Sequence, residues 1–538
     1  MLIFMNMHNH TKEYHFLLTT ILSFMIWGIG ATNANAENNP LHAVLEGQAS
    51  SSNTRTPLWH NANKYGLSTL NKTYAYARVN VEYDKDTLLK YFSLKMGADM
   101  VLPFHFYQQG YKEVHTSRLI IQQLYSDLHW KGIGICLGFR QYPAQLRNNL
   151  LSSGAQTLGI NARPIPQGRI YRDTWWEIPG LRKWVGFKGH IAYGITTDAE
   201  WQETFARGTN LPYNRWSRHH EKAGYLRIGN ESRFPLTMTL GLEMASQFGG
   251  TLYNYKGADQ NGYRGYHYLK LKSDLLSYWH AFVSGGGDTD EKKYQNSEGN
   301  QLGSRLIRLD WKRPEYAIGV YMDHFFEDHS GLFSIDFDGY GTGDEWKEKK
   351  EFKYLHYPMK DFQLGIDLEL KYFHPIQGIV IEYMNTTYQS GPIYHDHNEG
   401  NPDHVGGIDD YYNHSTLPGW QHWGQAIGNP LYRSPQYNTD GYIYFEANRF
   451  RAWHGGINGE FSNNLSYRVL YTWQKAFGTY AMPFAQPKEN QSLLLELTYH
   501  LPNFMQFQKP LIRLSYASDK GTLLGNNSGF QFTLQYKL

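Results

Sequence analysis

The chain has one cysteine, almost no net charge and a single long apolar run. Cys136 is the only cysteine among 538 residues. An internal disulfide is therefore excluded, as is a lipid-modified cysteine directly after a signal peptide. Lys and Arg number 51 and Asp and Glu 49, so the net charge is +2. A chain this close to neutral lacks the basic footprint of a nucleic-acid-binding protein.

The long apolar run lies near the N-terminus. Residues 16–31 are largely apolar and follow Lys12, and Ala-Asn-Ala at residues 34–36 is an A-x-A cleavage pattern. Together they predict a secretory signal peptide over residues 1–36, because the run is short for a membrane anchor. No later stretch approaches the roughly 20 apolar residues of a membrane helix. A helical inner-membrane protein is excluded, whereas an outer-membrane β-barrel needs only alternating strands.

Aromatic residues and glycine are abundant in a chain that is polar overall. Aromatics make up 16% of the residues, with 42 Tyr, and there are 52 Gly. The mean hydropathy is nevertheless −0.57. This combination fits a structure in which alternate residues face different solvents.

An apolar–polar alternation with a period of two begins after residue 72 and continues to the C-terminus. In its clearest run, residues 362–372, six large apolar side chains alternate with Gln, Gly, Asp, Glu and Lys. A soluble sandwich also alternates, but here the apolar faces are deep enough for a lipid band about 25 Å tall. Rings also recur at strand ends, as in interfacial girdles. We predict an all-β fold, a large antiparallel transmembrane barrel over residues 73–538, with residues 37–72 as a small helical or irregular segment at its periplasmic end.

Polar segments of unequal length separate the strands. The longest are candidates for external loops, and short turns are expected on the periplasmic side. These segments span residues 198–221, 251–262, 285–303, 327–350 and 391–437.

Candidate metal and catalytic residues are few. His395 and His397 flank Asp396 and are metal-ligand types, but no zinc spacing signature is matched. Residues 336–339 (DFDG) lack the closing Glu of a calcium loop. A glycosidase needs two carboxylates across a cleft; Glu382, Asp396 and Asp410 are candidates whose separation the sequence does not give. No G-x-S-x-G elbow is present, so we predict no metal, no cofactor and no catalytic residue.

Tryptophan pairs are the stronger signal. Trp175 and Trp176 lie in RDTWWEIPG, and Trp420 and Trp423 lie in PGWQHWG. A sugar offers an apolar C–H face and a rim of hydroxyls, so such rings beside polar groups suit it. The alternative is an interfacial belt of the barrel. We predict polysaccharide contacts from these four tryptophans, with polar contacts from His395, Asp396 and His397.

Several long segments resemble the Wzi-type capsule assembly family of outer-membrane barrels. The segments that carry this resemblance are 150–169, 241–250, 323–333 (DHFFEDHSGLF), 382–397 (EYMNTTYQSGPIYHDH), 411–435 (YYNHSTLPGWQHWGQAIGNPLYRSP) and 448–459 (NRFRAWHGGING). The resemblance implies a barrel of about 18 strands, with a helical element at the periplasmic end and loops folding over the pore. It also implies a lectin that holds capsular polysaccharide at the cell surface, not an enzyme.

The sequence therefore predicts an exported outer-membrane protein that binds capsular polysaccharide and helps to attach or assemble the capsule. We expect a monomer that contacts outer-membrane lipid, with capsule export machinery as a further candidate partner. The alternatives are a porin-like channel for sugars and a surface glycan hydrolase. Conductance would reveal the channel, and new reducing ends would reveal the hydrolase.

Overall fold

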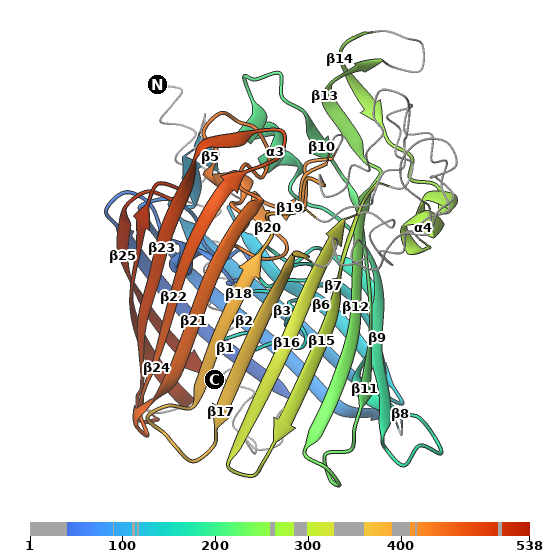
Figure 1. Cartoon of the computed structure of the whole chain (residues 1–538), viewed down its shortest axis with the longest axis vertical. Helices are drawn as coiled ribbons and strands as arrows, with labels where there is room; N and C mark the ends of the chain where they lie inside the picture. The colour runs from blue at the N-terminus through green and yellow to red at the C-terminus, as the bar shows by residue number, and fades with distance from the viewer. Residues whose placement is uncertain are drawn as a thin grey trace, which may run out of the picture.

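Eighteen strands close into one antiparallel barrel in the computed structural model (Figure 1). The structure describes residues 40–89, 91–109, 113–115, 118–258, 264–283, 299–327, 360–389, 409–414, 417–503 and 508–537. Each barrel strand pairs with the preceding and following one, and the last returns to the first, where Leu45 lies opposite Tyr536. The predicted fold class and strand number are confirmed.

The barrel strands follow one another in chain order. They are β1 (Leu41–Ser52), β2 (Thr73–Leu89), β3 (Phe92–Phe104), β6 (Ile120–Trp130), β7 (Ile133–Phe139), β8 (Gln167–Glu177), β9 (Val185–Ile195), β11 (Arg218–Ile228), β12 (Leu236–Phe248), β15 (Asn300–Lys312), β16 (Tyr316–Glu327), β17 (Phe362–Leu370), β18 (Gly378–Asn385), β21 (Arg449–Ser462), β22 (Leu465–Gly478), β23 (Pro483–His500), β24 (Gln508–Gly521) and β25 (Asn527–Lys537).

The two ends of the barrel differ in the length of their connections. One end, here called the short-turn end, carries turns such as 313–315 and 371–377. The other, the long-loop end, carries connections such as 140–166 and 386–448 (Figure 1). Strand β1 starts and β25 finishes at the short-turn end, because Val44 pairs with Lys537. This division matches the expected split between periplasmic turns and external loops.

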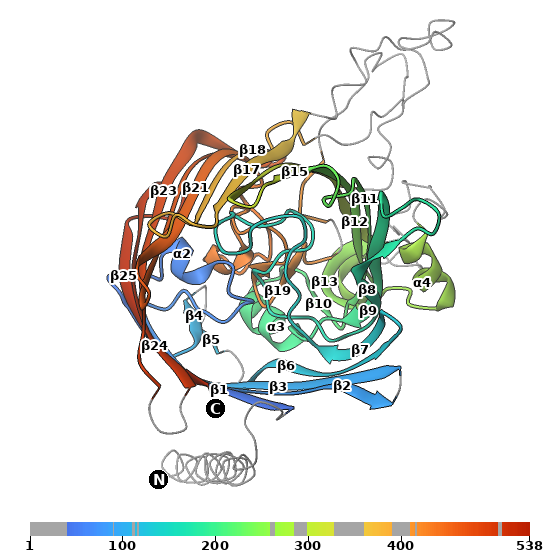
Figure 2. The same cartoon turned by 90° about the horizontal axis from the view of Figure 1, so that it is seen from below.

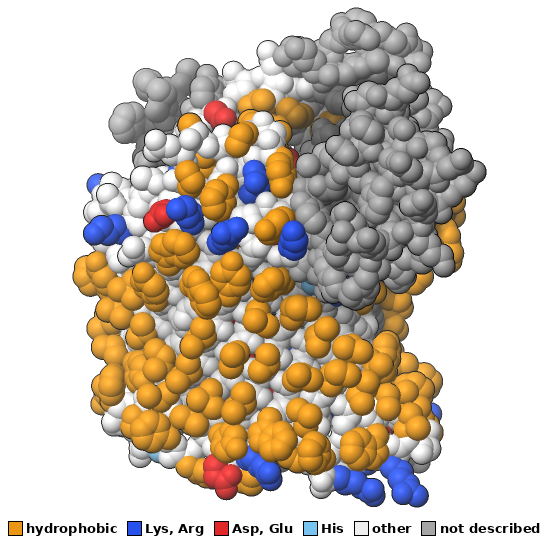
Figure 3. Space-filling model, in the orientation of Figure 1, with side chains coloured by type: hydrophobic (Ala, Val, Ile, Leu, Met, Phe, Trp, Pro, Cys, Tyr) orange, Lys and Arg blue, Asp and Glu red, His pale blue; other side chains and the backbone are white. Residues whose placement is uncertain are grey.

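The outer wall is apolar, as the alternation predicted. On β17, Leu364 and Ile366 are 42% and 50% exposed, whereas Gln363 between β16 and β18 is fully buried on the inner wall. Apolar side chains cover the lower wall in Figure 3, and Lys and Arg appear mainly above and below this band. Such a band is what lipid requires of a barrel.

Shorter elements belong to the connections. The helices among the described residues are α2 (Leu58–Asn61), α3 (Ala199–Ala206), α4 (Leu275–Phe282) and the 3₁₀ turn η5 (Pro435–Tyr437). Small sheets pair β4 (Tyr107–Gln109) with β5 (Glu113–His115), β19 (Gln421–His422) with β20 (Gln425–Ala426), and β13 (Thr251–Ala258) with both β10 (Tyr213–Arg215) and β14 (Arg264–Lys270). Among the described residues, no helix is long and apolar enough to cross a membrane.

The segment expected outside the barrel, residues 37–72, is placed differently. Its part Leu41–Ser52 is barrel strand β1, paired with β2 and β25. The outward side chains of β1 become small toward its end, with Gly47, Ala49 and Ser51, so the apolar half of the alternation was too weak to indicate a strand. Residues 53–72 enter the lumen from the long-loop end.

Candidate functional site

Three connections fold back from the long-loop end into the lumen. We call them together the plug, defined as residues 53–72, 140–166, and 409–414 with 417–448. Figure 2, seen from the short-turn end, shows them inside the ring of strands. In an open channel this space would hold water. Here much of it is filled by protein.

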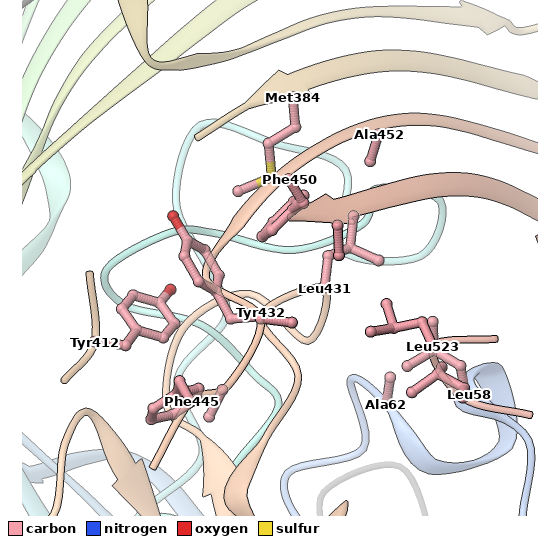
Figure 4. Close-up of a cluster of buried hydrophobic side chains, with 14 of the residues drawn as sticks. Leu58, Ala62, Met384, Tyr412, Leu431, Tyr432, Phe445, Phe450, Ala452 and Leu523 are labelled. Atoms are coloured by element: carbon pink, nitrogen blue, oxygen red, sulfur yellow. The ribbon is translucent and has the colours of Figure 1, made fainter. Parts of the chain in front are cut away.

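The plug has its own apolar core against the barrel wall. The rings of Tyr412 and Tyr432 stack at 3.9 Å, and Phe450 of β21 meets Tyr432 edge-on at 5.1 Å. Phe325 of β16 lies 4.7 Å from Tyr411. Figure 4 shows part of this cluster, with side chains from the plug and from the strands pointing toward one another. The plug therefore forms its core largely from tyrosine rings packed against side chains of the wall.

Hydrogen bonds join the three plug connections to each other and to the wall. The hydroxyl of Tyr412 donates to the carbonyl of Gln156 and accepts from the N–H of Asn429 at 3.0 Å. The indole N–H of Trp420 donates to the carbonyl of Thr157 at 3.0 Å. The N–H of Ser153 donates to Glu382 of β18 at 2.7 Å. The plug is thus a packed part of the fold.

A polar cavity lies between the plug and the wall formed by β8 to β12. We call it the Arg163 cavity. Its volume is about 90 Å³, several times what one water molecule needs. Three tyrosines, Tyr65, Tyr142 and Tyr225, line it together with basic, acidic and amide side chains. The polar lining residues are Arg140, Gln141, Gln145, Arg163, Gln167, Arg169, His190, His219, Glu221 and Glu243.

Glu221 is the centre of the polar network on the wall of this cavity. Its carboxylate accepts from Arg169 at 2.7 Å and from Gln167 at 3.1 Å, and Nε2 of His219 lies 3.3 Å away. The guanidinium of Arg169 lies 3.8 Å above the ring of Tyr142. Charge-assisted bonds of this kind hold donors and acceptors in fixed directions around the cavity.

Arg163 differs from the other arginines of the cavity. Its side chain is 8% exposed and its guanidinium lies 4.4 Å over the ring of Trp423. Its guanidinium donates no hydrogen bond within the described part of the chain, and the negative charge of Asp198 favours its cationic form. Burial lowers the pKa of the Arg163 guanidinium to about 10, so it remains cationic at neutral pH. A buried cation with donors to spare is a ready partner for an oxygen-rich ligand.

Glycine allows the first plug connection to approach Arg163. Gly66 has φ +69°, and a Cβ there would lie 2.5 Å from Cγ and 2.6 Å from the backbone nitrogen of Arg163. Both the left-handed backbone and the close contact exclude a larger residue. The neighbouring Tyr65 is thereby placed on the lining of the cavity.

The chemistry of the Arg163 cavity suits a saccharide unit. Tyrosine rings offer flat apolar faces, while guanidinium, carboxylate, imidazole and amide groups supply donors and acceptors at the rim. Nδ1 of His219 and Nε2 of His190 are buried and make no hydrogen bond among the described residues. Polar groups in such numbers favour a hydroxylated ligand over an apolar one.

Trp420 and Trp423 lie in the plug beside this cavity. Trp420 is fully buried and its ring stacks on His219 at 5.3 Å. The backbone N–H of Trp423 donates to the carboxylate of Asp198 at 3.2 Å, and the guanidinium of Arg163 lies over the Trp423 ring. The ring faces of both tryptophans are already in contact with protein, so neither ring is open for direct stacking, and each instead positions a neighbouring side chain, His219 or Arg163.

Trp175 and Trp176 are not brought together with the other pair. Both lie at the short-turn end of β8. Trp176 is 48% exposed on the outer wall opposite Phe187, which is the position of an interfacial aromatic. Trp175 is half-buried, with Lys188 and Arg227 each 5.0 Å from its ring. The structure thus places Trp176 on the outer wall, whereas Trp175 packs in a cluster with Tyr225 of the cavity lining and Leu146 of the plug.

The other metal-ligand and carboxylate candidates from the sequence lie either outside the described residues or in hydrogen bonds within the fold. His395, Asp396 and His397 lie outside the described residues, as does the DFDG segment. Glu382 is 1% exposed and accepts from Tyr321, Gln363 and Ser153, while Asp410 accepts from Tyr444 at 2.6 Å. Both carboxylates are engaged in holding the plug and the wall. In the described chain, no group of three or more His, Cys, Asp or Glu side chains is arranged to hold a metal.

The Arg163 cavity was not predicted from the sequence. Arg163 belongs to the segment 150–169, which was notable only through the family resemblance. Glu221, His219 and His190 alternate on ordinary strands, where polar inward residues are expected. A single signal was available: charged residues on the inner faces of β8 to β12 are close in the barrel because these strands are neighbours.

Comparisons with known proteins show the fold. No protein-family model matches this chain, and no curated protein matches it. Among solved structures it is similar to Wzi, an outer membrane protein of Escherichia coli described as involved in group 1 capsule assembly and as a carbohydrate-binding β-barrel. The two share 13% identity and a TM-score of 0.51 over 93% of this chain and 85% of that one.

More distant similarities are to porins. OpdK of Pseudomonas aeruginosa, solved with vanillate, is 8% identical with a TM-score of 0.45, and a BenF-like porin of Pseudomonas fluorescens Pf-5 is 8% identical with a TM-score of 0.46. Each comparison covers 93% of this chain and 99% of the other. The strand topology and the similarity to Wzi show that the chain is a closed 18-stranded β-barrel of the outer-membrane type.

Proposed function

We propose that this protein binds surface polysaccharide in the outer membrane and does not act as an open pore. The observation that carries the proposal is the Arg163 cavity beside the packed plug, because its lining of aromatic rings and charged groups suits a saccharide. The description of Wzi as a carbohydrate-binding barrel supports the same function for a chain that shares its fold. Such binding would help to attach or assemble a capsule at the cell surface.

The contacts would come from two sets of residues. Arg163, Arg169 and Glu221 would hydrogen-bond the hydroxyls or carboxylates of one sugar unit, with Trp420 and Trp423 fixing His219 and Arg163 in place. His395, Asp396 and His397 remain proposed contacts in the long connection between β18 and β21. Several weak contacts along a polymer give avidity without a deep pocket. Trp176 lies on the outer wall, so we propose no sugar contact for it, whereas Trp175 would act through Tyr225, with which it packs in one cluster.

The experiment is direct binding of the purified, detergent-folded protein to capsular polysaccharide of its own strain, with reducing ends assayed in the same samples. Saturable binding without new reducing ends is expected. Release of reducing ends would establish the hydrolase instead, and would direct attention to Glu221 and Glu243. Failure to bind while the barrel remains folded would refute the proposed function.

A sugar channel is the second candidate, and the same cavity is the observation that favours it. The cavity lies in the lumen, along the route that a small sugar or organic acid would take. For this candidate the plug would have to move, because its core fills much of the lumen. Conductance across a planar bilayer separates the two functions: a plugged binder passes little current, and a channel passes much more.

A further inference from the structure

Helix α4 lies outside the barrel, against the wall formed by β9, β11 and β12. Figures 1 and 2 show it beyond the ring of strands near the long-loop end. On β11, His219 and Glu221 face the lumen, so the intervening His220 and its neighbour Lys222 face outward. If no other segment covered them, both side chains would contact lipid, and burying an unpaired polar group in lipid costs free energy.

One face of α4 provides that cover. The ring of Tyr278 lies 5.4 Å from Tyr193 and 5.1 Å from Phe248. The hydroxyl of Tyr193 donates to the carbonyl of Tyr278 at 2.9 Å. Lys222 donates to the carbonyl of Phe282, the last residue of the helix, where a cation also complements the helix dipole. The helix is therefore docked on outward-facing strand residues.

The opposite face of α4 is apolar and exposed. Leu275 is 90% exposed, Leu276 59%, Trp279 58% and Val283, just past the helix end, 41%. Leu276, Trp279 and Val283 follow Leu275 by one, four and eight residues, which puts all four on one side of a helix. The side chains buried against the barrel are those of Ser277 and Ala281.

This exposed face continues the lipid-facing band. Directly toward the short-turn end on the same strands, Ile191, Leu240 and Leu242 are 36–41% exposed on the outer wall. Met244, the next outward residue of β12, is 7% exposed. The helix α4 therefore lies where the exposed apolar band of the wall ends. Lys270 and Lys272, just before the helix, are exposed. Apolar residues with a tryptophan and adjacent lysines are typical of a helix at a membrane interface.

We infer that α4 is an interfacial helix whose outer face lies among the lipids of the outer leaflet. Leu275, Leu276 and Trp279 contact acyl chains near the headgroups. The helix thereby ties the connection between β12 and β15 to the membrane surface beside the barrel. This role is independent of polysaccharide binding and of the state of the lumen.

The test is an environment-sensitive fluorophore on a cysteine at position 275, in a Cys136→Ser background, with the protein in phosphatidylcholine vesicles. A label at Ile366 on the lipid-facing wall is the positive control, and a label at Leu181 in a short turn is the aqueous control. Heat modifiability of each variant on gels verifies that the barrel is folded.

We expect the label at Leu275→Cys to be quenched by a lipid carrying a nitroxide near its headgroup, as at Ile366→Cys, and to resist iodide. Quenching by iodide alone, as at Leu181→Cys, would overturn the inference. Protection from both quenchers would overturn it too, because another protein segment would then cover the helix.

Discussion

The plug core and the Arg163 cavity lie side by side in one lumen and are built on opposite principles. In the plug core, Tyr411, Tyr412 and Tyr432 are fully buried in ring contacts. In the cavity, Arg163 is almost as buried, yet its guanidinium donates no hydrogen bond among the described residues. A fully satisfied core stabilises one structure, whereas spare buried donors stabilise a complex. We therefore interpret the plug core as the part that closes the lumen and the Arg163 cavity as the proposed binding site.

The largest effect is expected from removing Tyr412. Tyr412→Ala deletes a stacked ring and a hydroxyl that joins Gln156 to Asn429. Truncating a buried aromatic costs about 3–5 kcal/mol, enough to loosen the plug while the hydrogen-bonded barrel persists. Planar-bilayer conductance should rise well above that of the wild type. Tyr372→Ala, at a ring 73% exposed near the short-turn end, is the matched control and should leave conductance low. Equal conductance in both variants would contradict closure by the plug core.

The next effect is expected from Arg163. Arg163→Gln removes the unpaired cation while the ring of Trp423 stays in place. Hydrogen bonds to charged groups contribute about 1.5–3 kcal/mol, so polysaccharide affinity should fall roughly tenfold to a hundredfold. Arg449→Gln is the control, because Arg449 also stacks on a ring, that of Tyr480 at 3.8 Å, but lies outside the cavity. If the two variants bound equally well, the cavity would have no part in recognition.

Acidification should loosen the plug without any substitution. Burial lowers the pKa of His60 to about 2 and that of His414 to about 4, against about 6.5 when exposed. Both are neutral in the folded plug, so an opened plug takes up more protons below pH 6.5. Stability is thus fully present above that pH and falls as the pH drops toward 4, by about 1.4 kcal/mol per histidine and pH unit.

Conductance and amide hydrogen exchange of plug residues, compared at pH 7 and pH 4.5, test this dependence. Both should increase at the lower pH. A His60→Gln variant should show a smaller increase, since one of the two groups is removed. Exchange that is independent of pH over this range would contradict the assignment.

The smallest effects are expected from the tryptophans. Trp423→Phe keeps a ring under Arg163 but weakens the cation–π contact, which contributes about 0.5–1 kcal/mol at most sites, so affinity should fall only a few-fold. Trp176→Phe should leave binding unchanged, because Trp176 lies on the outer wall at the short-turn end. A large loss with Trp176→Phe would place recognition at the end of the barrel opposite to the plug.

Strand alternation made the barrel predictable, and its limits explain the errors. On β17 every second residue is large and apolar, and the strand lies where the pattern indicates. On β1 the outward residues become small toward the long-loop end, so the strand was missed. A period of two identifies a lipid-facing strand only when the outward side chains are large.

The candidate site was less predictable, because it is made by residues far apart in the chain. Trp420 and Trp423 were identified from ring chemistry, and both adjoin the Arg163 cavity. Their stacking partners, His219 and Arg163, come from a wall strand and from another plug connection. Nothing local in the sequence relates these segments. Only closure of the barrel and the return of the plug bring them together.

Polysaccharide binding and lumen closure can be measured together, when the same vesicles carrying the wild-type protein are assayed for binding of capsular polysaccharide and for swelling in isosmotic small sugars. We expect saturable binding of the polysaccharide and little swelling. Rapid swelling without polysaccharide binding would contradict this expectation, and would identify the protein as a channel whose plug opens in the membrane.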